Sequence, residues 1–215
     1  MPKLKPETHA ARRTHVLDCA ERCFSRLGFH RTTMADICSE AGISAGALYV
    51  YFNSKEALIA GIIERDRAQL TERFNLLFDS PDVIGALAAL GQTYFVEEPP
   101  HKRQLAAEIG LEANRNEAVG QAFHDVDTYC RESFQALFAT QAAEGRIAPT
   151  LDPQTLTMVV TIIGDGLIWR RAIDPNFDAN SVLPALLDII GRLLNPQGQL
   201  AADTVATHKP SEKTR

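Results

Sequence analysis

The segment Gly42-Ile43-Ser44-Ala45-Gly46 has a serine between two glycines, the G-x-S-x-G spacing of the nucleophile elbow in hydrolases. In that motif a strand leads into the turn, and a later acid and histidine activate the serine for attack on an acyl group. The residues before Gly42 have helical spacing instead, and no later histidine has a visible partner (His101, His124, His208). We therefore predict that Ser44 caps a helix and that the chain is not an enzyme.

The cysteines are the other residues that could do chemistry: Cys19, Cys23, Cys38 and Cys130. Cys19 and Cys23 lie one helical turn apart and Cys38 lies one helix away, which would suit a thiol sensor or a metal cluster. Cysteine is also a common small residue of protein cores, and we favour core packing for these residues. The chain has no His/Glu metal spacing, P-loop or glycine-rich nucleotide motif, so we expect no metal and no cofactor.

The composition is that of an ordinary globular protein, with 45% hydrophobic and 23% charged residues in a chain of 215. No apolar run reaches the roughly 18 residues of a membrane-spanning helix, and the N-terminal stretch lacks the apolar core of a signal peptide. We expect a cytoplasmic protein with no membrane partner.

Charge is unevenly distributed along the chain. Residues 1–55 hold 8 basic and 5 acidic residues, a net charge of +3, whereas residues 56–215 hold 14 and 22, a net charge of −8. A small basic segment on a large acidic remainder indicates that only the N-terminal segment meets a polyanion such as DNA.

Periodicity predicts consecutive helices and no convincing strand, and hence an all-α fold of about nine helices. Thr33 and Asp36 resemble a capping box, Ser44 caps a short helix, and Asn53 or Ser54 caps a long one that reaches Phe78. Later helices are expected at about 82–97, 101–112, 117–144, 152–172 and 178–194. We expect a helix-turn-helix domain at 1–55, a second helical domain at 56–195 and a disordered tail at 196–215.

Two short helices joined by a tight glycine-containing turn can place the second helix in the major groove of DNA. Over residues 10 to 60 the sequence closely resembles the DNA-binding domain of TetR-type (tetracycline-repressor-type) transcription regulators. The matching residues are Gly28-Phe29, Thr32-Thr33, Ile37, Ala41-Gly42-Ile43-Ser44, Gly46, Leu48-Tyr49, Tyr51-Phe52 and Ser54-Lys55-Glu56.

Residue chemistry and this resemblance together predict contacts to double-stranded DNA. The hydroxyls of Thr33, Tyr49 and Tyr51, the free backbone N–H groups beside Thr33 and the charge of Lys55 suit phosphates. Ser44 and Gly46 let the recognition helix approach the duplex closely, and the resemblance adds Ala45 and Val50. Tyr49 could instead be half-buried, and Tyr51 could pack inward beside Phe52. The recognition segment SAGALYVY has no Arg, Lys, Asn or Gln, so sequence would be read by methyl contacts and DNA shape.

The resemblance implies that the second domain forms a homodimer through its last two helices. Their apolar stripes would supply the interface residues Leu156, Val160, Ile163, Gly164, Leu167, Leu183, Leu187, Ile190 and Leu194. The alternative is that these stripes belong to one self-contained monomeric core.

The resemblance also implies a cavity for a small-molecule inducer among the middle helices. Candidate lining residues are Phe74, Tyr94, Phe95, His101, Phe123, Phe134, Asp165 and Trp169, although His101 directly after two prolines also suits a helix start. Asp165 lies in an otherwise apolar helix, and a buried carboxylate there needs a partner such as Arg170, Arg171 or a cationic ligand.

We therefore predict a ligand-responsive regulator, with repression favoured over activation. It would bind a two-fold operator as a dimer and be released by a small apolar or amphipathic inducer, with the long fourth helix as the lever between cavity and DNA. Two alternatives are a helical adaptor that binds only protein and a helical enzyme. The adaptor leaves the DNA-contact spacing of Thr33, Tyr49 and Lys55 unexplained.

Overall fold

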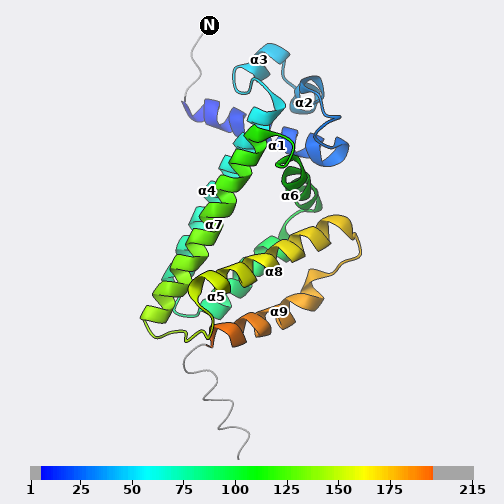
Figure 1. Cartoon of the computed structure of the whole chain (residues 1–215). Coiled ribbons are helices and arrows are strands. Elements are labelled where there is room, and N and C mark those ends of the chain that lie inside the picture. The colour runs from blue at the N-terminus through cyan, green and yellow to red at the C-terminus, as the bar shows by residue number, and fades with distance from the viewer. Residues whose placement is uncertain (1–5, 196–215) are drawn as a thin grey trace, which may run out of the picture.

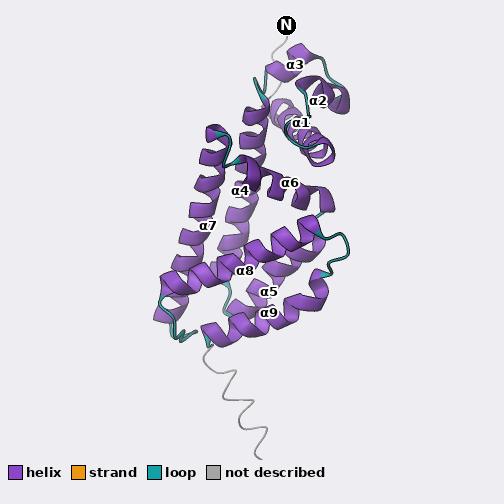
Figure 2. Ribbon diagram, turned by 45° about the vertical axis from the view of Figure 1, so that its right-hand side comes forward, coloured by secondary structure: helices purple, strands orange, loops and turns teal. Residues whose placement is uncertain are grey.

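The computed structural model describes residues 6–195, which form nine α-helices and one π-helical segment without a strand (Figures 1 and 2). The elements are α1 (Pro6–Leu27), α2 (Met34–Ala41), α3 (Ala45–Tyr49), α4 (Lys55–Asp79), α5 (Val83–Gly91), η1 (Gln92–Glu97), α6 (Pro100–Glu112), α7 (Glu117–Ala143), α8 (Pro153–Ile173) and α9 (Ala179–Leu194). The predicted all-α class is confirmed. The predicted tail at 196–215 lies outside the described residues.

Local sequence signals set the ends of the first three helices. Gly28 and Gly42 have φ angles of 77° and 64°, a left-handed conformation that glycine adopts at little cost, and they end α1 and α2. Thr33 and Asp36 form the predicted capping box at the start of α2. The Ser44 hydroxyl accepts a hydrogen bond from the Ala47 N–H at 3.3 Å, which confirms that Ser44 is a helix cap.

Two hydrophobic cores hold the molecule together, one in the head, which is the part formed by α1–α3, and one in the body, which is the part formed by the later helices. The head core lies under α1–α3 and consists of Val16, Leu17, Ala20, Cys23, Phe24, Phe29, Ile37, Leu48, Phe52, Leu58, Ile59, Ile62, Leu105, Ile109 and Val119. The body core consists of Phe74, Leu77, Val83, Leu87, Leu137, Phe138, Ile147, Leu156, Val160, Ile190 and Leu194. Because the head core takes side chains from α4, α6 and α7, its packing crosses the predicted domain boundary at residue 55, which remains a prediction.

Two long helices connect the head to the far end of the molecule. In both ribbon views α4 and α7 run side by side along this axis, and they pack on each other (Figures 1 and 2). Shorter α6 packs against both α1 and α8, while α5, α8 and α9 lie at the end away from the head. The head is therefore joined to the body through α6 as well as through α4.

The stretch 82–97, predicted as a single helix, is an α-helix followed by a π-helical segment in the structure. After α5 the chain widens into η1, where the Glu98 N–H donates to the Thr93 carbonyl at 3.0 Å. The Arg171 guanidinium, only 8% exposed, donates to the carbonyls of Tyr94 and Val96 at 2.7 and 3.1 Å and to that of Glu98 at 3.5 Å. Arg171 therefore satisfies carbonyl groups that the ending helix leaves free.

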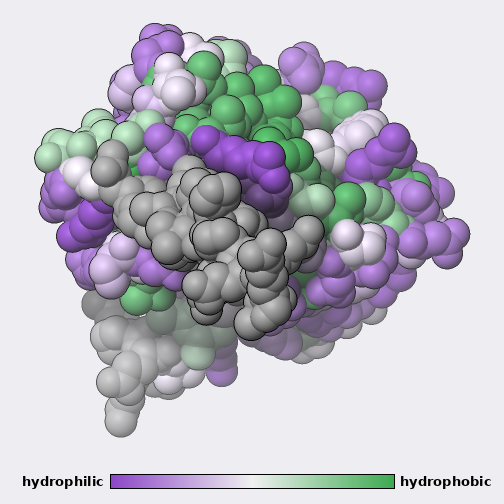
Figure 3. All heavy atoms as spheres, turned by 90° about the horizontal axis from the view of Figure 1, so that it is seen from below, coloured by the Kyte–Doolittle hydropathy of each residue, from purple (hydrophilic) through white to green (hydrophobic). Residues whose placement is uncertain are grey.

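No helix within residues 6–195 is both long and apolar enough to cross a membrane. Seen from the end away from the head, hydrophobic residues gather in one area of the surface beside a polar band (Figure 3).

Candidate nucleic-acid interface and ligand cavity

One face of the head presents most of the predicted DNA contacts to solvent. Tyr49 is 53% exposed and Val50 is 71% exposed, so both side chains are available for contact outside the head. The other exposed members of this face are Thr33, Ser44, Ala45 and Gly46. The face therefore combines hydroxyl groups, small residues and one long aromatic side chain, and the DNA contacts themselves remain predictions.

The surface of α3 at Gly46 is open enough for another molecule to approach the backbone closely. A Cβ atom built on Gly46 meets no heavy atom within 4 Å, so the glycine is not required by packing inside the protein. The lack of a side chain leaves the outer surface of α3 free at this position, which is compatible with the predicted close approach to DNA.

Tyr51 packs inward, as the second interpretation of this residue proposed. It lies partly buried against the head core, and its ring centroid is 4.6 Å from that of His9. A role in the fold therefore explains Tyr51 without DNA.

Lys55 also has a structural role. Its Nζ donates to the carbonyls of Phe29 and His30 at 2.7 and 3.2 Å and lies 4.6 Å from the centroid of the Phe29 ring. An ammonium group has three donors, so one remains for the predicted phosphate contact. Removing Lys55 would nevertheless disturb the chain between α1 and α2.

His101 lies at the junction of head and body, and its predicted place in the ligand cavity is wrong. Its Nε2 is 3.1 Å from the carboxylate of Glu21, a residue only 2% exposed, which also pairs with Arg65. The Ser25 hydroxyl donates to the His101 carbonyl at 2.7 Å. The proline pair therefore starts α6 where His101 can hold α1, rather than where it could reach a ligand.

The other end of α6 contacts the loop between α1 and α2. His30 Nε2 lies 2.9 Å from a carboxylate oxygen of Glu112, and the Phe29 N–H donates to Glu108 at 3.3 Å. Movement of α6 would consequently move the loop that leads into the predicted DNA-binding face.

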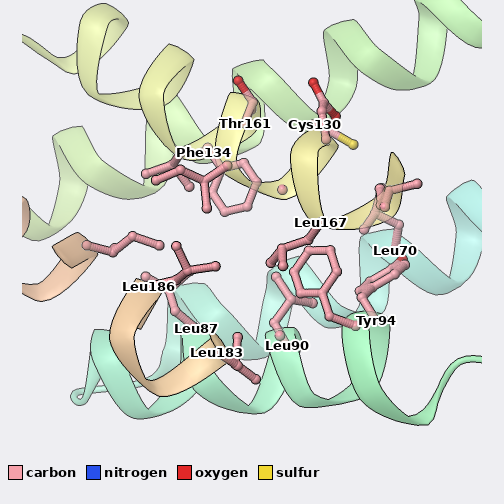
Figure 4. Close-up of a pocket in the computed structure, with 18 of the residues that line it drawn as sticks. Leu70, Leu87, Leu90, Tyr94, Cys130, Phe134, Thr161, Leu167, Leu183 and Leu186 are labelled. Carbon is pink, nitrogen blue, oxygen red and sulfur yellow. The ribbon is translucent and has the colours of Figure 1, made fainter. Parts of the chain in front are cut away.

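A cavity of about 280 Å³ lies in the body between α4, α5, η1, α7, α8 and α9 (Figure 4). Six predicted ligand residues line it: Phe74, Tyr94, Phe95, Phe123, Phe134 and Asp165. The prediction for Trp169 is wrong, because its side chain is 47% exposed and lies outside the lining set. Leucines from four helices complete the wall, including Leu70, Leu87, Leu90, Leu167, Leu183 and Leu186.

The predicted dimer-interface residues face the inside of the subunit. Leu156 and Leu194 have no exposed surface at all, so they belong to the body core and cannot bury further area against a partner. The remaining members line the cavity: Val160, Ile163, Gly164, Leu167, Leu183, Leu187 and Ile190. The prediction is therefore wrong for Leu156 and Leu194 and stays a prediction for the other members, because helical periodicity identifies an apolar face without saying which neighbour covers it.

A different set of apolar residues on the same two helices is exposed. Met158, Ile162, Trp169 and Ile173 recur at helical spacing on α8 with exposures between 47% and 60%, and Ile189 on α9 is 48% exposed. Large exposed apolar side chains in such a row are typical of a protein–protein contact surface.

The charged residues in the cavity lining are both acids, Asp127 on α7 and Asp165 on α8. Burial raises the pKa of the Asp165 carboxyl, and the negative charge of Asp127 raises this pKa further. Burial also raises the pKa of the neighbouring Cys130 thiol, to about 12. Asp127 and Cys130 were missed by sequence reasoning, although they share one helical face with Phe123 and Phe134.

The remaining cysteines pack in the head. Cys19 and Cys23 have no exposed surface, and burial raises the pKa of both thiols, which disfavours the reactive thiolate. These observations support core packing over a thiol sensor. Within residues 6–195 no group of three or more His, Cys, Asp or Glu side chains is arranged to hold a metal ion.

Comparison with known proteins identifies relatives of both the head and the whole chain. Residues 16–62 match the model of the family described as bacterial regulatory proteins, tetR family. The HTH-type transcriptional repressor Rv1474c of Mycobacterium tuberculosis is 33% identical over 192 residues, which cover 88% of this chain and 96% of that protein.

Two solved structures show the same fold. Salmonella enterica GusR superposes with a TM-score of 0.72 at 27% identity, over 86% of this chain and 95% of its own. The FadR regulator of Bacillus subtilis, solved in complex with stearoyl-CoA, superposes with a TM-score of 0.69 at 19% identity, over 82% of this chain and 96% of its own.

Proposed function

The chain belongs to the tetR family of bacterial regulatory proteins and is a DNA-binding transcriptional regulator, and we propose that it is a dimeric repressor released by a small molecule. The observation that carries this proposal is the pairing of two features in one chain. An exposed helix-turn-helix face suits DNA, and an apolar cavity in the body suits a ligand. We place its action in the cytoplasm, where the chromosome lies.

The outer face of α8 and α9 supports the proposed dimer. Burying Met158, Ile162, Trp169 and Ile173 against a two-fold mate would remove large apolar side chains from water. Two heads related by that axis would meet two half-sites separated by whole helical turns of DNA.

The path from cavity to head supports ligand response. Helix α4 lines the cavity with Leu70 and Phe74 and enters the head core with Leu58 and Ile62. The second connection runs from η1, which also lines the cavity, through α6 to α1. A ligand that prefers one arrangement of these helices would change operator affinity by the coupling free energy, commonly about 1–3 kcal/mol.

The direct test is a titration of the protein against a duplex carrying the DNA around its own gene. We expect tight binding that prefers this duplex to a scrambled one and weakens steeply with salt, because phosphate contacts release counterions. Tyr49→Ala should lower the affinity by about tenfold, whereas Tyr51→Phe, a change inside the head, should leave it within about twofold.

Lys55 is a poor choice for this test because its loss would disturb the head as well. Equal, weak binding to both duplexes would contradict a repressor of its own region. Salt-insensitive binding would contradict phosphate recognition.

A further inference from the structure

The cavity wall is apolar and aromatic, and its charged members are all negative. The wall includes the rings of Tyr94, Phe95, Phe123 and Phe134, and its ionisable side chains other than Tyr94 and Cys130 are Asp127 and Asp165. No Lys, Arg or His belongs to the lining. A ligand carrying a carboxylate or phosphate would meet two acids and no cation among the lining residues themselves.

The two acids differ in their partners. Asp127 pairs with Arg131 at 3.1 Å, one helical turn along α7. Asp165 has neither an ion pair nor a side-chain hydrogen bond within residues 6–195, and neither Arg170 nor Arg171 reaches it. Arg171 is held by backbone carbonyls instead. Asp165 is exposed to solvent and also belongs to the cavity lining, so its unpaired carboxylate is open to the charged end of a group that enters the cavity.

Two arginines of α4 lie close to aromatic rings, of which Tyr94 lines the cavity and Tyr129 does not. Arg73 is 4.4 Å from the centroid of the Tyr94 ring, and Arg67 is 5.0 Å from that of Tyr129. Both are on α4 and neither lines the cavity. Among the described residues neither forms an ion pair with Asp165, whose pKa is raised by burial and by the charge of Asp127.

We propose that the cavity selects small hydrophobic cations, whose ammonium group pairs with Asp165 while the apolar part contacts the rings and leucines. Aromatic rings stabilise an adjacent ammonium through cation–π contacts, and a carboxylate without an ion pair can form a charge-assisted hydrogen bond with that ammonium. A cation also relieves the repulsion between Asp165 and Asp127. This inference rests on the proposed role of the cavity as the inducer site and names the class of inducer.

The cavity suits a small ligand. Its volume of about 280 Å³ lies near the lower end of the roughly 300–1,000 Å³ of small-molecule pockets. The stearoyl-CoA of the FadR structure, with its long acyl chain and its phosphates, differs from this ligand class in both size and charge.

Three probes on one carbon skeleton test the inference: 3-phenylpropylamine, which is protonated at pH 7, 3-phenylpropan-1-ol and 3-phenylpropionate. Dissociation constants are measured by ligand-observed NMR on the full-length protein. We expect the ammonium to bind about tenfold more tightly than the alcohol, and the carboxylate to bind most weakly. Asp165→Asn should remove the preference for the ammonium and leave alcohol binding within about twofold.

Asp188→Asn is the matched control, because Asp188 pairs with Arg192 on the exposed side of α9 and lies outside the cavity lining. It should leave all three affinities unchanged. The inference is overturned if the alcohol or the carboxylate binds the unmodified protein as tightly as the ammonium, if Asp165→Asn leaves the ammonium affinity intact, or if none of the probes binds.

The same samples are then titrated against the duplex from the region of its own gene. Cation binding that leaves operator affinity unchanged would overturn the proposed ligand response and retain the cation site. Release by the alcohol or the carboxylate alone would retain the ligand response and overturn the inference.

Discussion

At the residue scale, a substitution of Gly46 can distinguish a residue needed for DNA binding from one needed for folding. Its position is open toward solvent, so Gly46→Ala should not clash inside the head and should stabilise the recognition helix by about 0.5 kcal/mol. If DNA approaches as closely as proposed, the added methyl group should lower operator affinity by about tenfold. Thermal unfolding and duplex titration measure the two effects separately.

Gly110 in α6 is the matched control for Gly46. A Cβ there also meets nothing within 4 Å, and the residue lies far along the chain from the recognition helix. Gly110→Ala should therefore stabilise the fold by a similar amount without changing operator affinity. An unchanged affinity in Gly46→Ala would show that DNA does not approach this glycine.

At the scale of elements, local signals explain which parts of the fold the sequence predicts. The Thr33–Asp36 capping box and the Ser44 cap depend on neighbouring residues, so the predicted helix starts match the structure. The partner of a helix face depends on residues far away in the chain. The stripe of α8 could therefore be recognised as apolar, but not assigned to cavity, core or dimer. His101 shows the same limit, because Glu21 lies 80 positions earlier.

The π-helical segment η1 depends on such a distant contact. Arg171 in α8 holds its carbonyls, while the exposed neighbour Arg170 has no comparable contact among the described residues. Arg171→Lys keeps the charge but loses the planar donor set, so we expect it to lower the free energy of unfolding by about 2 kcal/mol. Because η1 carries Tyr94 and Phe95, ligand affinity should fall as well.

Arg170→Lys provides the comparison for this change. An exposed arginine without such contacts should tolerate the substitution within about 0.5 kcal/mol. Denaturant unfolding of both variants measures the difference. Equal stability of the two would mean that η1 does not need the Arg171 contacts.

At the scale of the whole molecule, the exposed row on α8 makes the proposed dimer testable without disturbing the subunit. Ile162 is 60% exposed, so Ile162→Glu adds a charge to the proposed interface while leaving the cavity and body core intact. A desolvated, unpaired charge at an interface is strongly unfavourable, and we expect the variant to be a folded monomer by light scattering and circular dichroism. Losing the second head should weaken operator binding by about a hundredfold or more.

Leu76 on α4 is 72% exposed and outside the proposed interface, so Leu76→Glu should remain dimeric and bind the operator normally. A dimeric Ile162→Glu protein would place the interface on another face, and a monomeric one with full operator affinity would show that a single head is sufficient.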